Sequence, residues 1–146
     1  MILNRSLVFA ALLLIPGVVA AQQSSPLVRV GGPIRGSAAF AEVMVRRVEL
    51  TADLESFAAD YTDQNPKVLD ARAELLAIER ALTAIYAVKP TETERLTLAL
   101  GKLLVRRAAF ETDLARLSRS YAKDHPEVKR AKRRVEIFDA AIREIL

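Results

Sequence analysis

The stretch Tyr61-Thr62-Asp63-Gln64-Asn65-Pro66-Lys67-Val68 occurs a second time, 60 residues later, as Tyr121-Ala122-Lys123-Asp124-His125-Pro126-Glu127-Val128. The similarity continues on both sides of this stretch. Between residues 45–86 and 105–146, eleven of the 42 aligned positions are identical, and no gap is needed. Self-similarity at a fixed spacing indicates one supersecondary unit that is used twice.

The first 21 residues have the pattern of a secretory signal peptide. Arg5 supplies the positive charge, residues 7–15 form an apolar segment, and Val19-Ala20-Ala21 has the small residues of a signal peptidase site. Cleavage near Ala21 predicts an exported, periplasmic protein. The alternative, an uncleaved membrane anchor, needs about 20 apolar residues, and Pro16-Gly17 interrupts this run earlier. Residues 22–36 are rich in Gly, Ser and Pro and predict a flexible leader.

Composition excludes several classes of function. The sequence has no cysteine, which excludes disulfides, thiolate metal sites and lipid attachment to a cysteine. Loss of Arg5 with the signal peptide leaves 21 basic and 18 acidic residues, a net charge of +3. This small excess is not typical of a nucleic-acid-binding protein, and export argues further against that partner.

From Ser37 onwards, apolar residues recur every three or four positions, and no segment has the alternating pattern of a strand. Proline interrupts the pattern at three places and divides it into four helices. The second helix is expected to start at Asn65-Pro66 and the fourth at His125-Pro126, because Pro fits the first helical position. Residues 91–94, Thr-Glu-Thr-Glu, have the form of a capping box and predict the start of the third helix.

These helices predict an all-α fold of two antiparallel hairpins, over residues 37–88 and 91–146, because the connections are short. The arrangement would be an up-down-up-down four-helix bundle or an elongated coiled coil, a narrow rod with both turns at one end. The apolar residues that recur along each helix form one apolar face, and six further residues widen these faces. The wider faces would let the four helices close on each other or let hairpins exchange between chains. The six residues are Val45, Val48, Leu69, Leu76, Leu104 and Val105.

Two arginines, Arg47 and Arg107, interrupt the apolar series of the first and third helices. A turn centred near residues 63 and 64 places Arg47 next to Glu79, and the repeat then places Arg107 beside Asp139. We predict both as ion pairs across the hairpin seams, where they would set the register more than they add stability.

Each hairpin ends in a tip formed by the repeated motif. Tyr61 and Tyr121 occupy the last apolar position before the turn, and each ring is expected to close over the Pro and Val that follow it. The predicted tip residues are Tyr61, Asn65, Pro66 and Val68 in the first copy, and Tyr121, His125, Pro126 and Val128 in the second.

The tip motif and the heptad helix after it resemble the periplasmic coiled-coil segments of polysaccharide co-polymerases, the chain-length determinant family and its exopolysaccharide-export relatives. The second copy is the closer match, since Asn65 stands where the family pattern has His. The resemblance covers residues 45–86 and 105–146 and implies a periplasmic hairpin that assembles with other subunits and with polysaccharide machinery. This sequence does not show the second transmembrane helix, the proline-rich membrane-proximal segment or the kinase domain of that family.

The sequence predicts no catalytic, metal-binding or cofactor-binding residue. His125 is the only histidine and lies at a helix start, so we expect it to cap the helix; a pH-sensing tip is the alternative. The carboxylates alternate with polar residues on solvent faces, whereas acid–base catalysis needs a concave site. We therefore do not expect an enzyme.

One run of positive charge stands out on the predicted fourth helix: Lys129, Arg130, Lys132, Arg133 and Arg134. One interpretation is a solvated helix face that Glu127 and Glu136 balance. The other is a surface for anionic polysaccharide or lipid headgroups.

Two functional hypotheses follow from these patterns. The favoured one is a non-catalytic periplasmic scaffold that binds protein partners or itself through its helical seams, in association with envelope polysaccharide export. The alternative is a periplasmic stress-type chaperone or adaptor that binds clients through an exposed apolar helical face.

Overall fold

The computed structural model describes residues 32–146, so the predicted signal peptide and leader residues 22–31 lie outside the described residues. The all-α class is confirmed: the described chain consists of helices packed against one another and has no strand. Its elements are α1 (Gly32–Arg35), α2 (Ala38–Asp60), α3 (Pro66–Tyr86), the 3-10 helix η1 (Pro90–Arg95), α4 (Leu98–Ser120) and α5 (Pro126–Ile145).

The helices α2 and α4 begin at positions 60 residues apart. The Ser37 hydroxyl accepts the N–H of Phe40 at 3.3 Å, and the Thr97 hydroxyl accepts the N–H of Leu100 at 3.2 Å. Each hydroxyl therefore satisfies one of the free N–H groups at a helix start. Ser37 and Thr97 are repeat partners, and their equivalence was a sequence signal for the start of α4.

The prediction that a capping box at residues 91–94 starts the third helix is wrong. This segment forms η1, and α4 begins only after Thr97. Between the two helices Leu96 has a non-helical backbone and is 2% exposed. The chain leaves the helical path here, and the Leu96 side chain joins the hydrophobic core.

Part of the predicted flexible leader belongs to the fold. Residues 32–35 form the short helix α1, and Ile34 packs against the hydrophobic core. The Ser37 hydroxyl donates to the carbonyl oxygen of Ile34 at 2.7 Å, which ties α1 to the start of α2.

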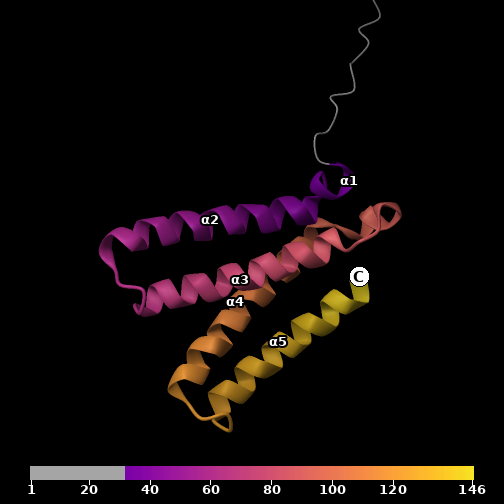
Figure 1. The fold of residues 1–146 in the computed structure, drawn as a ribbon. Helices are drawn as coiled ribbons and strands as arrows, with labels where there is room; N and C mark the ends of the chain where they lie inside the picture. Colours follow the sequence, from indigo (N-terminus) through magenta and orange to yellow (C-terminus); the bar gives the residue numbers. More distant parts are fainter. Residues whose placement is uncertain (1–31) are drawn as a thin grey trace, which may run out of the picture.

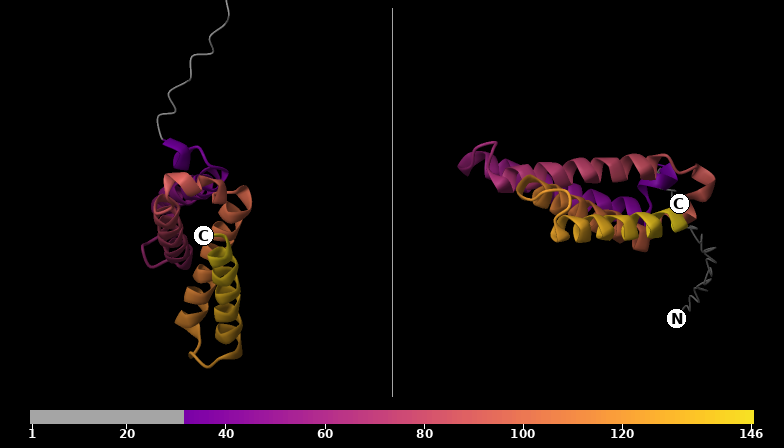
Figure 2. Two further views of the ribbon diagram at one scale, coloured as in Figure 1. Left: turned by 90° about the vertical axis from the view of Figure 1, so that its right-hand side faces the viewer. Right: turned by 90° about the horizontal axis from the view of Figure 1, so that it is seen from below.

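The four long helices form two antiparallel hairpins, α2–α3 and α4–α5, that diverge from a common base (Figures 1 and 2). Helix α4 packs against α2, α3 and α5, whereas α5 packs mainly against α4. Both tips point away from the base, but they are separate. The predicted tandem antiparallel hairpins are therefore confirmed. They do not form a narrow rod, because the hairpins meet near their bases and splay toward their tips.

The hydrophobic core lies where the hairpins meet. Its largest fully buried side chains come from α2, α3 and α4: Val43, Leu50, Ile78, Ile85 and Leu100. Small buried residues beside them, Ala77 and Ala81 on α3 and Ala108 on α4, let the helix backbones approach closely. Helix α4 therefore buries two sides: one packs against α5, and the other packs against the first hairpin.

Helices α2 and α4 are in close contact at Gly101. A Cβ atom at this position would lie 2.9 Å from both the Cα of Ala39 and the Cβ of Glu42. The N–H of Ala39 also donates to the carbonyl oxygen of Leu96 at 3.2 Å, which links the start of α2 to the segment before α4. The glycine inside a helix is therefore required by the close approach of a neighbouring backbone.

We expect Gly101→Ala to lower the stability of the fold. Alanine favours an exposed helix by about 1 kcal/mol over glycine, but the forced separation of α2 and α4 should cost about 1–3 kcal/mol. Thermal and urea unfolding followed by circular dichroism would measure the difference. The repeat partner Ala41 is exposed, so Ala41→Gly reports helix propensity alone. A stabilised Gly101→Ala protein would contradict the close approach.

Candidate interaction surfaces

The two hairpin tips have the same backbone. Tyr61 and Tyr121 end their helices in extended conformation, with φ and ψ of −127° and 151° and of −130° and 152°. Asn65 and His125 then cap the next helix: Asn65 Oδ1 accepts the N–H of Lys67 at 2.9 Å, and His125 Nδ1 accepts the N–H of Glu127 at 3.2 Å. The repeated motif therefore encodes one turn geometry with two different caps.

The tyrosine rings make different contacts at the two tips. Tyr121 stacks on His125 with ring centroids 4.2 Å apart, whereas Tyr61 lies edge-on to Phe57 at 5.8 Å and beside the ammonium of Lys67. Val68 and Val128 are buried, and the proline after each cap is exposed. The two tyrosines thus contact different side chains, and the closure of each ring over Pro and Val stays a prediction.

The ion pairs predicted across the seams are present. Arg47 Nε donates to Glu79 Oε1 at 2.5 Å, and Arg107 Nε donates to Asp139 Oδ1. The second arginine also contacts Glu111 at 2.9 Å. Both side chains of the first pair are about 45% exposed, so this pair contributes little stability, and its effect is on how the helices align.

The first hairpin has a further ion pair between α2 and α3 that was not predicted. Arg46 Nε donates to Glu74 Oε1 at 2.7 Å, and Glu74 is buried. The hydrogen bond to Glu74 raises the pKa of the Arg46 guanidinium, against the opposing effect of burial. The repeat partners of these residues are Arg106 and Arg134. The second hairpin therefore carries two like charges where the first has a salt bridge.

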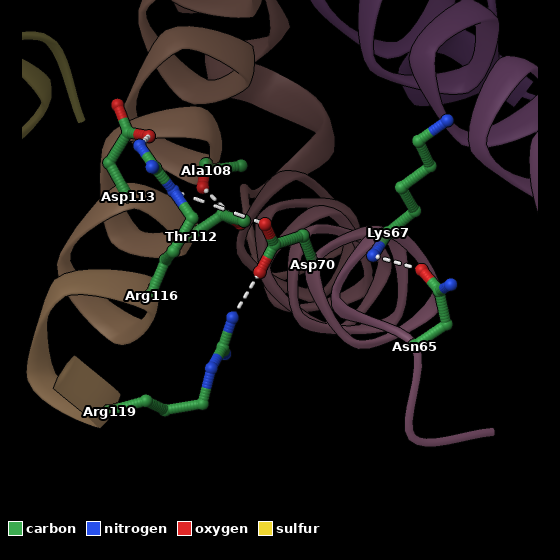
Figure 3. Close-up of polar contacts among 8 residues, drawn as sticks. All are labelled: Asn65, Lys67, Asp70, Ala108, Thr112, Asp113, Arg116 and Arg119. Carbon is green, nitrogen blue, oxygen red and sulfur yellow. Dashed lines mark hydrogen bonds and ion pairs between the residues drawn. The ribbon is translucent and has the colours of Figure 1, made fainter.

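Further ion pairs join the two hairpins. Figure 3 shows Asp70 of α3 reaching toward Arg116 and Arg119 of α4; the carboxylate accepts a hydrogen bond from Arg119 and lies 3.9 Å from the Nε of Arg116. Nearer the base, Arg80 of α3 donates to Glu111 of α4 at 2.7 Å. The contact between the hairpins is thus apolar at the base and ionic toward the tips.

The predicted basic run lies on α5 and is exposed: Lys129, Arg130, Lys132, Arg133 and Arg134. Three of these residues contact acids close to them in sequence: Arg130 contacts Glu127, Arg133 contacts Glu136, and Lys129 lies 3.5 Å from Asp124. The Arg134 guanidinium lies over the ring of Phe110 on α4 at 5.9 Å. These acidic partners offset part of the positive charge of the run, and Lys132 and Arg134 add to what remains.

Helix α2 has a second apolar face that the first hairpin does not cover. We call it the outer face of α2 and define it by the exposed residues Ala41, Val45, Val48 and Ala52; Phe40 and Met44 at its edge are half-buried and pack against the core. Val45 and Val48 are 58% and 60% exposed, although their apolar character predicted a place in the closed bundle. A depression of about 350 Å³ follows this face and is lined by Val48 and Ala52 together with Arg47, Thr51 and Glu55. Another, of about 510 Å³, lies between α2 and α3, where Phe40 and Met44 meet Glu79 and Tyr86.

Two further structural features bear on the class of protein. Among residues 32–146, no three His, Asp or Glu side chains come close enough together to hold a metal ion. Over the same residues, no helix combines the length and the apolar composition that crossing a membrane requires. The surfaces with distinctive chemistry in this part of the chain are the tips, the basic face of α5 and the outer face of α2.

Reversing one charge of the Arg47–Glu79 pair should lower stability by roughly 0.2–1 kcal/mol, because the pair is about half exposed. In the double variant Arg47→Glu with Glu79→Arg, the attraction is restored, and we expect most of the loss to be recovered. Urea unfolding of the two single variants and the double variant gives the coupling energy. A double variant no more stable than the singles would show that the pair does not set the register.

The capping role of His125 predicts a matched pair of variants. His125→Ala removes the acceptor for the N–H of Glu127 and should cost about 1 kcal/mol. His125→Asn installs the residue that caps the same turn in the first repeat and should retain the stability of the parent. Thermal unfolding distinguishes the two, and equal losses in both variants would mean that stacking on Tyr121, not capping, is the contribution of His125.

No protein-family model matches this chain, and neither a curated protein nor a solved structure matches it. The resemblance of the tips to polysaccharide co-polymerase hairpins therefore stays a prediction from the motif. What the chain does has to be inferred from the three surfaces described above.

Proposed function

We propose that this protein is a non-catalytic scaffold that is exported to the periplasm and binds a protein partner through the outer face of α2. The observation that carries the proposal is the exposure of Val45 and Val48 on one side of α2, where Val48 and Ala52 line a shallow depression. Contiguous apolar patches on a soluble protein mark interaction sites. The face belongs to a long and regular helix, which suits a fixed partner.

The setting of this function comes from the sequence. The signal-peptide pattern of residues 1–21 supports export, and the repeated tip motif supports assembly in envelope polysaccharide export. The exposed basic face of α5 adds a second, weaker point of contact for an anionic polysaccharide or for lipid headgroups. Nucleic acid is not proposed as a partner, because export separates the protein from it.

A stress-type chaperone is the second candidate, and the same exposed apolar face favours it. The two functions differ in what covers the face. A scaffold covers it with one partner in a fixed geometry, whereas a chaperone leaves it open for unfolded clients.

We expect the full chain, expressed in a Gram-negative host, to be recovered from the periplasmic fraction with Gln22 as its first residue, as mass spectrometry would show. Light scattering over a concentration series should then detect a discrete assembly that does not bind a dye for exposed apolar surface. A monomer that binds the dye and suppresses aggregation of an unfolded client would replace the scaffold with the chaperone. Recovery of the uncleaved chain from the cytoplasm would contradict export.

A further inference from the structure

The surroundings of one arginine differ in charge between the two hairpins. In the first hairpin, Arg46 donates hydrogen bonds to Glu74 at 2.7 Å and to Glu49 at 3.0 Å. Glu42 lies one helical turn before Arg46 on the same side of α2. The repeat partner of Arg46 is Arg106 of α4. The positions equivalent to the three acids hold Arg134, Ala109 and Lys102, in that order. The second hairpin thus keeps the arginine and replaces all the acids around it.

Arg106 and Arg134 lie beside one another across the α4–α5 seam. The equivalent ion pairs across the two seams show that both hairpins align their helices in the same register, so Arg134 takes the place of Glu74. Phe110 supports the same placement independently. It follows Arg106 by four residues and is its neighbour on α4, and the Arg134 guanidinium lies over its ring at 5.9 Å from the centroid.

Neither Arg106 nor Arg134 forms an ion pair with another of residues 32–146, and both are exposed. Two acids line a depression of about 180 Å³ together with Arg134, and each is bound by an arginine of its own helix: Asp113 by Arg116, and Glu127 by Arg130. Glu42 of α2 lines another depression with Lys102 and Arg106, again without an ion pair among these residues. The two guanidinium groups therefore offer hydrogen-bond donors that a ligand from solution can reach.

We propose that Arg106 and Arg134 bind a carboxylate group of an acidic polysaccharide, which takes the place of the Glu74 carboxylate in the first hairpin. This inference rests on the polysaccharide setting of the proposed function and assigns it residues and a chemical group. The planar guanidinium presents paired N–H groups that match the two oxygens of a carboxylate. Phe110 lines the depression beside Arg134 and offers an apolar surface to the C–H groups of a sugar ring.

A membrane surface fits the same observations less well. Consecutive residues of an α-helix are about 100° apart, so Lys132 and Arg134 point to nearly opposite sides of α5. A flat layer of lipid headgroups that reaches one of them leaves the other uncovered. The exposed acids Glu127 and Glu136 also lie along α5 and would be repelled by anionic headgroups. A single carboxylate between two arginines avoids both difficulties.

The decisive variant is Arg134→Glu, which gives the second hairpin the residue that binds the arginine in the first. The introduced carboxylate should pair with Arg106, so thermal unfolding should show a fold at least as stable as the parent. Binding of an oligogalacturonate of defined length should weaken by about tenfold or more, because the carboxylate of the chain then occupies the site. Calorimetric titration of the purified protein at about 0.15 M ionic strength measures the affinity.

Lys132→Glu is the matched control, since it makes the same change in net charge on the opposite side of α5. We expect its affinity to fall by less than about threefold, because salt screens an exposed charge that does not contact the ligand. The methyl ester of the same oligosaccharide keeps the sugar rings without the charges and should not bind. Arg106→Gln should weaken binding in the parent and have no further effect in the Arg134→Glu protein.

The possible outcomes separate this inference from the scaffold function. Equal losses in Arg134→Glu and Lys132→Glu would show that binding follows total charge alone and would overturn the site. Binding to phosphatidylglycerol vesicles without binding of the oligosaccharide would overturn the ligand. Light scattering of Arg134→Glu should detect the same assembly as the parent, because neither arginine belongs to the outer face of α2. Failure of oligosaccharide binding with an intact assembly overturns this inference and leaves the scaffold function standing.

Discussion

The close approach of α2 and α4 at Gly101 is the contact on which the rest of the structure depends. Two backbones meet there without an intervening side chain, and the bond from the N–H of Ala39 to the carbonyl of Leu96 holds the base of both hairpins together. Such a contact near one end lets the helices diverge toward the other (Figure 2). The hairpins share a core at the base and separate at the tips, where Asp70 and the arginines of α4 make the remaining contacts.

This geometry breaks the symmetry of the repeat. Helices α2 and α4 are the first helices of their hairpins, and a symmetric packing would bury the same face of both. In this structure α4 buries that face against the first hairpin, whereas α2 has no further hairpin to pack against. Internal repeats that stack on one another commonly leave the end units with a surface the inner units bury. Soluble repeat arrays make their end faces polar; this chain keeps Val45 and Val48 exposed on its first hairpin. An uncovered face with that composition is the physical basis of the scaffold function proposed above.

The ionic contacts divide into two kinds with different consequences. Arg47 with Glu79 and Arg107 with Asp139 occupy equivalent positions, so they repeat the alignment of helices within each hairpin. Arg46 with the buried Glu74 has no counterpart, because the second hairpin has arginine at both positions. The repeat thus keeps one ion pair across the seam of each hairpin and replaces the other by two arginines in the second hairpin. Charge reversal on an open surface affects which partner it attracts far more than it affects the fold.

Sequence alone determined the elements and their alignment: the all-α class, the starts of α3 and α5 at Asn65-Pro66 and His125-Pro126, and the seam contacts of Arg47 and Arg107. These follow from local periodicity, capping chemistry and the arithmetic of a tight turn, all of which act over short separations. The start of α4 at Thr97 was also encoded locally, by the equivalence with Ser37, whereas the Arg46–Glu74 pair and the exposure of Val45 and Val48 were decided by the tertiary structure. A series of apolar residues along a helix shows that this face can be buried. Whether it is buried depends on how helices far apart in sequence pack together. Here the contact of α2 with α4 at Gly101 fixes that packing.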